Sequence, residues 1–141
     1  MEPILKFDNV SKHYPNGVHA LKGVSFAIRE GEFVSVIGPS GSGKSTLLRA
    51  INRLIPISGG TVWLDGQAVS ALRGRSLRQL RRKVGMIFQN YNLVYSLSVL
   101  QNVLHGRLGY MSGVKGVLGL YSEADKQEGL DLLAELGLAD F

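Results

Sequence analysis

A glycine-rich run of eight residues limits the possible folds more than any other part of the sequence. Residues 38–45 read Gly-Pro-Ser-Gly-Ser-Gly-Lys-Ser and match G-x-x-x-x-G-K-[ST] at every position. The apolar residues 33–37 precede the motif between two glycines, as a buried parallel strand would. After it, apolar residues recur at helical spacing over 45–54. A strand, a glycine-rich turn and a helix in this order predict a phosphate-binding loop.

The chemistry of phosphate binding explains each part of this motif. Glycines adopt backbone conformations that other residues avoid, so successive N–H groups can point inward around phosphate oxygens. The following helix adds unpaired amides and the positive end of its dipole. Lys44 is expected to bind the β- and γ-phosphates of ATP, and the Ser45 hydroxyl to bind Mg²⁺. The predicted nucleotide-binding residues of the loop are Gly38, Pro39, Ser40, Gly41, Ser42, Gly43, Lys44, Ser45 and Thr46.

The rest of the chain predicts short strands and short helices. Strands are expected at 4–10, 24–28, 61–64 and 84–88, and turns at 14–17, 58–60 and 65–66. Helices are expected at 76–82, 98–104 and 122–136, the last capped by Ser122 and ended by Gly137. The loop helix is expected to stop at Pro56. Five glycines between 106 and 119 favour a mobile loop there.

Charge and composition narrow the possible functions. The net charge is +5, from 16 basic and 11 acidic residues, and no cysteine is present to form disulfides or thiolate metal sites. Six basic side chains without an acid are interpreted as a solvated helix face rather than a nucleic-acid surface, because no aromatic residues interleave with them: Arg73, Arg75, Arg78, Arg81, Arg82 and Lys83. No signal peptide and no membrane-spanning run is found, so a membrane role is expected only through a partner.

Residues on both sides of the loop carry a family resemblance. They are Phe7–Lys12 with Tyr14, then 20–26, 30–32, 58–62, 65–66 and 84–89. In this order they resemble the ATP-binding subunits of ABC transporters. In that family an aromatic residue at the position of Tyr14 stacks on adenine. A glutamine at the position of Gln89 reaches Mg²⁺ or the attacking water. The resemblance therefore implies catalytic roles for Lys44 and Gln89, and Mg²⁺ ligation by Ser45 and Gln89.

A narrower resemblance lies further along the chain. Residues 92–94 and 98–109 look like the phosphonate-importer branch of the family. This implies ATP-driven import of a phosphonate or a related phosphorus oxyanion. The implied partners are transmembrane permease subunits, a second ATPase copy in a homodimer and, indirectly, a substrate-binding protein. The implied location is peripheral, on the cytoplasmic side of the cell membrane.

The resemblance also implies an α/β fold. A P-loop NTPase core would lie beside an antiparallel β-subdomain and an incomplete helical subdomain, and residues 1–141 would form the N-terminal portion of the nucleotide-binding domain. No L-S-G-G-Q signature and no strand ending in Asp-Glu is present. His13, His19 and His105 are interpreted as ordinary polar residues rather than the family's switch histidine. We therefore expect weak MgATP binding and no appreciable turnover by these 141 residues alone.

Two alternatives stay open at this point. The missing motifs favour a nucleotide-binding module without ATPase activity. A small P-loop kinase, with the basic stretch as a lid, would share the loop motif. In such kinases the loop follows the first strand, whereas here about thirty residues precede it.

Overall fold

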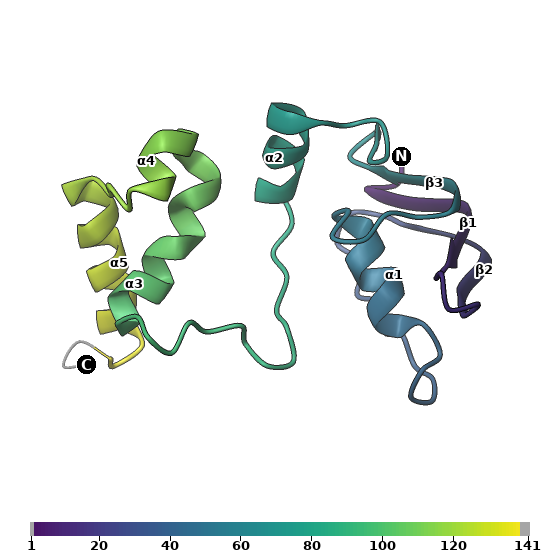
Figure 1. Cartoon of the computed structure of the whole chain (residues 1–141), viewed down its shortest axis with the longest axis horizontal. Coiled ribbons are helices and arrows are strands. Elements are labelled where there is room, and N and C mark those ends of the chain that lie inside the picture. Colours follow the sequence, from purple (N-terminus) through teal and green to yellow (C-terminus); the bar gives the residue numbers. More distant parts are fainter. Residues whose placement is uncertain (1, 139–141) are drawn as a thin grey trace. The chain divides into compact units, whose positions relative to one another are not determined.

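An antiparallel sheet and two helices form the first of two units in the chain. The computed structural model describes residues 2–138, so both ends of the predicted portion 1–141 lie outside the described residues. The first unit is Met1–Val84 and the second is Gly85–Phe141 (Figure 1). The first holds β1 (Leu5–His13), β2 (His19–Ile28), α1 (Lys44–Ile51), β3 (Gly59–Leu64), β4 (Gln67–Ala68) and α2 (Gly74–Arg82).

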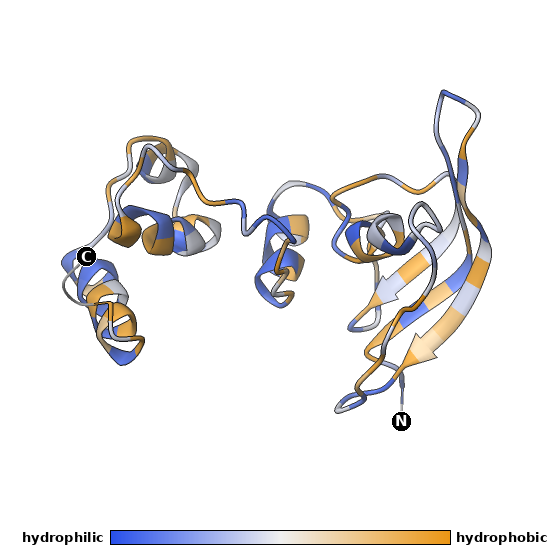
Figure 2. Cartoon of the chain, turned by 90° about the horizontal axis from the view of Figure 1, so that it is seen from below, coloured by the Kyte–Doolittle hydropathy of each residue, from blue (hydrophilic) through white to orange (hydrophobic). Residues whose placement is uncertain are grey.

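The sheet has the order β2-β1-β3-β4, and every neighbouring pair is antiparallel. Apolar and polar residues alternate along its strands (Figure 2), which turns one set of side chains inward. Phe7 of β1 lies opposite Phe26 of β2, and their rings stack with centroids 4.7 Å apart. The β3–β4 hairpin turns at Asp65 and Gly66, both with positive φ, as the sequence predicted.

Helices α1 and α2 complete the core of this unit. Helix α1 contacts β2 and β3 and contributes the buried Ala50, while α2 contributes the buried Leu80. Helix α1 ends at Ile51, earlier than predicted from Pro56. The Leu54 N–H donates to the Arg49 carbonyl and the Arg53 N–H to the Ala50 carbonyl, with Arg53 in the left-handed region. This Schellman motif stops the helix before the proline is reached.

The pairing of β1 with β3 contains a β-bulge in β1 that faces Gly60. The register shifts between Asp8 and Ser11 of β1, where Asn9 has a φ of 49°. Gly60, with a φ of 77°, faces this point so closely that a Cβ there would lie 2.2 Å from the Asn9 carbonyl oxygen. Residues 58–60 were predicted as a turn, but β3 already begins at Gly59. The glycines serve close strand pairing rather than a turn.

Two predicted strands are wrong. Residues 33–37 and 84–88 form no regular structure, and Phe33, Ile37 and Ile87 are each more than nine-tenths exposed. A parallel strand needs hydrogen-bonding neighbours. No strand of the described chain pairs with either segment.

The second unit is helical. It contains α3 (Val99–Leu104), a 3-10 helix η1 (His105–Tyr110), α4 (Gly113–Val117) and α5 (Glu123–Glu135). Ser122 caps α5 as predicted, Ser98 caps α3 in the same way, and Gly137 follows α5 with a φ of 70°. No helix in residues 2–138 is long and apolar enough to cross a membrane.

Helical structure between 106 and 119 contradicts the predicted mobile loop. The Arg107 guanidinium in η1 pairs with Asp125 and Glu128 of α5, and Leu108 lies close to Gly116 of α4. These contacts offset the entropy that the glycines lose on ordering. Helices α3 and α5 meet at Gly129, where an added Cβ would lie 2.9 Å from Leu100 Cδ1.

The stability of the second unit is expected to depend on the charge of Asp125. The Ser122 hydroxyl donates to its carboxylate at 2.6 Å and Arg107 Nε at 2.7 Å, and both bonds lower the pKa of Asp125. A lowered folded pKa gives stability that is present above the unfolded pKa, about 3.9, and lost as pH falls through the folded value. We therefore expect α5 amides to lose protection from hydrogen exchange below about pH 4.

The matched variant is Asp125→Asn. It keeps a side-chain acceptor for the cap but cannot titrate, so its α5 amides should exchange faster at pH 7 and show a flatter pH dependence. An unchanged acid profile in this variant would contradict the assignment to Asp125.

Candidate phosphate-binding site

The predicted phosphate loop precedes α1 in the first unit. Gly43 is the N-cap residue of α1 with a φ of 93° and offers no side-chain cap, and its carbonyl accepts from the Leu47 N–H. Within the loop the Ser42 N–H donates to the Pro39 carbonyl at 3.3 Å. The loop thus leads into a helix N-terminus whose first amides have no side-chain partner, the arrangement that suits an anion.

Gly43 fixes how closely the loop approaches the sheet. A Cβ at this position would lie 2.3 Å from the Ala20 carbonyl oxygen of β2, a distance that no side chain tolerates. The Leu21 side chain lies beside the same point. Gly41 also has positive φ, at 80°, but a Cβ there would meet open space. Gly43 is therefore required by packing as well as by backbone conformation, and Gly41 by conformation alone.

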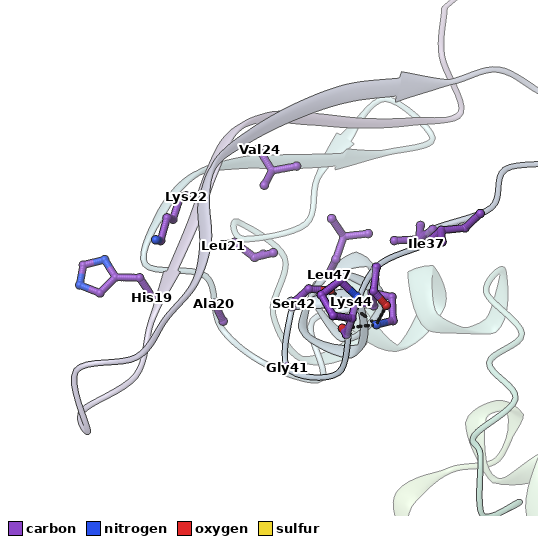
Figure 3. A pocket seen from close by; sticks show the side chains of 14 residues that line it. His19, Ala20, Leu21, Lys22, Val24, Ile37, Gly41, Ser42, Lys44 and Leu47 are labelled. Atoms are coloured by element: carbon purple, nitrogen blue, oxygen red, sulfur yellow. Dashed lines mark hydrogen bonds between the residues drawn. The ribbon is translucent and has the colours of Figure 1, made fainter.

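Lys44 folds back onto its own loop. Its ammonium donates to the Gly38 carbonyl at 2.6 Å and to the Pro39 carbonyl at 2.7 Å (dashed lines in Figure 3). The Ser42 hydroxyl lies further away, at 3.5 Å. Among the described residues no carboxylate forms a salt bridge with Lys44. The ammonium is therefore held by the carbonyl oxygens of its own loop and by no carboxylate of the described residues.

Residues of the loop and of β2 line a cavity of about 560 Å³. Figure 3 shows Leu21 and Val24 pointing from β2 toward the loop, whereas the His19 ring points away from it. Lys22 and Lys44 are both among the lining residues of the cavity. Of the predicted binding residues, those that line it are Gly38, Pro39, Gly41, Ser42, Gly43 and Lys44. Ser40 and Ser45 are exposed and Thr46 is half-buried, outside this lining.

Tyr14 lies in the β1–β2 turn and contacts helix α1. Its N–H donates to the Val18 carbonyl, which closes the turn, and its hydroxyl lies 3.4 Å from Thr46 Oγ1. The structure thus brings Tyr14 and Thr46 together, although Tyr14 does not line the cavity. The ammonium of Lys12 lies 4.9 Å from the centre of the Tyr14 ring. Sequence reasoning assigned no role to Lys12, which lies two residues before Tyr14 near the end of β1.

Gln89 belongs to the second unit. It is exposed in a turn closed by the Tyr91 N–H and the Phe88 carbonyl, and Tyr91 and Asn92 both have positive φ. The expected strand before it is absent, as described above. Its role as a Mg²⁺ ligand and catalytic residue stays a prediction.

Comparison with known proteins decides the family. A family model described as ABC transporter matches residues 21–141. The chain belongs to the ABC transporter family. Among curated members of this family it is 53% identical to phosphonates import ATP-binding protein PhnC 2 of Oceanobacillus iheyensis, over 97% of this chain and 54% of that protein. It is 50% identical to the PhnC protein of Treponema denticola, over 98% of this chain and 54% of the relative. The chain spans about half the length of these relatives, which confirm the resemblance to the phosphonate-import branch.

Solved ABC cassettes share the fold. The dimeric cassette MJ0796 in a post-hydrolysis state, bound to ADP and Pi, is 37% identical with a TM-score of 0.76, covering 92% of this chain and 56% of that one. A nucleotide-free ATP-binding cassette is 25% identical with a TM-score of 0.75, covering 97% of this chain and 55% of that one. The predicted ABC ATPase fold with an antiparallel β-subdomain is confirmed.

Proposed function

We propose that this chain is the ATP-binding portion of a subunit that energises an ABC importer, with a phosphonate or a related phosphorus oxyanion as cargo. The observation that carries the proposal is the loop: Lys44 lies on a cavity beside a helix N-terminus, and Gly43 seats the loop on β2. The names of the PhnC relatives support the cargo. Because the chain spans about half their length, we take residues 1–141 as the N-terminal portion of a nucleotide-binding domain.

The triphosphate of ATP would occupy the loop. Backbone N–H groups of residues 38–46 would bind its oxygens, and Lys44 would exchange its two carbonyl partners for the β- and γ-phosphates. Magnesium, when bound, neutralises the phosphate charge, and oxygen atoms are its preferred ligands. The Ser45 hydroxyl fits this need because it is exposed beside Lys44, and Gln89 would supply a second oxygen. Tyr14 would stack on the adenine.

The proposed protein partners are supported by the family and by one exposed segment that contains aromatic residues. Tyr91 and Tyr95, after Gln89, are at least three-quarters exposed. Aromatic residues are common at protein interfaces, which supports contact with a transmembrane permease at the cytoplasmic face of the membrane. A second ATPase copy is supported by the dimeric MJ0796 cassette. A substrate-binding protein would act indirectly, through the permease.

Replacing Lys44 with alanine tests nucleotide binding. The ammonium would make charge-assisted hydrogen bonds to phosphate, each worth about 1.5–3 kcal/mol, so MgATP affinity should fall by about 10- to 100-fold. Isothermal titration calorimetry with MgATP measures this. The control is Lys22→Ala, which removes the same charge from the same cavity but lies on β2, outside the loop. Equal losses of MgATP affinity in both variants would mean that the cavity attracts anions through its positive charge alone, without specific binding of phosphate by Lys44.

Turnover separates an ATPase from a module that only binds nucleotide. No L-S-G-G-Q segment lies within the 141 residues, so we expect a phosphate-release assay on this chain to stay near background. Turnover that disappears in Lys44→Ala would contradict that expectation and favour catalysis by the chain itself. Transfer to an added phosphoryl acceptor would favour a kinase instead.

A further inference from the structure

Lys12 is a largely buried residue whose ammonium has no carboxylate partner among the described residues. It occupies one of the inward positions of β1 and is only 9% exposed. Among the described residues no acidic side chain forms a salt bridge with Lys12. Its ammonium instead lies over the face of the Tyr14 ring. A lysine whose stem is buried usually directs its ammonium to water or to a carboxylate, whereas Lys12 directs its ammonium over an aromatic ring. The position of this ammonium therefore needs an explanation beyond packing.

The Tyr14 ring is held at two points. The Lys12 ammonium lies 4.9 Å from its centroid, within the range of a cation–π interaction, and its hydroxyl contacts Thr46 at the start of α1. The β1–β2 turn also fixes the Tyr14 backbone through the bond to Val18. The ring is half-buried, so it keeps exposed surface although Lys12 covers one face. A second planar group can stack only on the face that the cation leaves free.

We infer that Lys12 is a positioning residue for the nucleotide base, acting through Tyr14. This rests on the proposed function, in which Tyr14 stacks on adenine. The ammonium orients the ring and draws its π-electron density toward the covered face. The free face becomes less repulsive toward the electron-rich adenine, which favours stacking. Lys12 touches neither phosphate nor base in this arrangement.

A purely structural role for Lys12 makes the opposite prediction. Lysine often buries its methylene stem as packing and keeps its ammonium at the surface. If Lys12 only fills space, methionine of similar length should replace it without any effect on nucleotide binding. If the charge matters through Tyr14, Lys12→Met should bind ATP less well although the fold keeps its stability, since methionine fills the same space as the lysine stem.

Two probes measured on three chains test the inference. The probes are MgATP and magnesium tripolyphosphate, which carries the phosphates without the base, and the chains are wild type, Lys12→Met and Lys12→Arg. Lys12→Met is expected to weaken MgATP binding by about three- to ten-fold. Tripolyphosphate affinity and the thermal midpoint should not fall. Lys12→Arg keeps a cation over the ring and should retain most of the MgATP affinity.

A double-mutant cycle with Tyr14→Leu locates the effect. Once the ring is gone, Lys12→Met should cause no further loss of MgATP affinity. Unchanged MgATP binding in Lys12→Met would overturn the inference, and so would an equal loss for both probes, which would place the effect on the phosphates or the fold. Wild-type protein that binds neither probe would overturn the proposed function, and this inference with it.

Discussion

Gly43→Ala is expected to weaken MgATP binding by about a hundredfold or more. The added methyl group would lie 2.3 Å from the Ala20 carbonyl oxygen, and the residue would still need a φ of 93°. Left-handed strain costs about 1–2 kcal/mol and overpacking about 1–3 kcal/mol. The loop can avoid this cost only by moving away from β2, which displaces the amides and Lys44 together. Calorimetric titration with MgATP gives the size of the loss.

Gly41→Ala is the matched control for that experiment. It carries the same change two residues earlier, at a φ of 80°, but its methyl group would meet nothing within 4 Å. Only the backbone strain remains, so its loss of affinity should be about tenfold or less. If the two variants lose affinity equally, contact between the loop and β2 does not govern binding.

Gly60→Ala is expected to have the largest effect on stability. A Cβ there would lie 2.2 Å from the Asn9 carbonyl oxygen and 2.5 Å from that of Asp8, so β1 and β3 would have to separate at their bulge. Because β1 lies between β2 and β3 and carries Phe7 and Val10 of the core, we expect a loss of about 4 kcal/mol or more. Domains of ordinary stability have about 5–15 kcal/mol in total. Urea unfolding followed by circular dichroism measures it.

Gly66→Ala serves as the comparison for the strand variant. Gly66 lies in the β3–β4 turn with a φ of 70°, and nothing lies within 4 Å of its added methyl group. Its cost should stay near 1–2 kcal/mol, the strain of the left-handed backbone alone. A Gly60→Ala protein as stable as Gly66→Ala would show that the strands can separate at little cost.

Features that depend on neighbouring residues could be predicted from the sequence. Asp65-Gly66 gave the hairpin, and Ser122 gave the cap of α5, because a few adjacent residues determine both structures. The phosphate loop belongs to the same class, since its glycines and Lys44 are contiguous. The strand predicted at 33–37 was wrong for the converse reason. An apolar run becomes a strand only beside another strand, and within residues 2–138 no strand pairs with this segment.

The parts of the site that were missed are contacts between distant segments. The approach of Gly43 to Ala20 joins α1 to β2, and the contact of Tyr14 with Thr46 spans 32 residues. Lys12 could have been noted because it lies two residues before Tyr14, but its burial could not have been predicted. Gln89 shows the remaining limit, because its proposed role depends on an atom that would come from another part of the molecule.

The contacts of Lys44 are expected to make the loop favour highly charged ligands. Its ammonium already has two carbonyl acceptors at 2.6 and 2.7 Å, so any ligand must compete with the protein's own oxygens. Carbonyl oxygens are neutral dipoles, whereas phosphate oxygens carry formal charge and bind an ammonium more strongly. The net gain therefore rises with the charge that a ligand brings to the loop. A monophosphate therefore gives a smaller improvement over the carbonyl oxygens than a triphosphate does. The Gly38 and Pro39 carbonyl oxygens thus act as internal competitors, and a more highly charged ligand displaces them more readily.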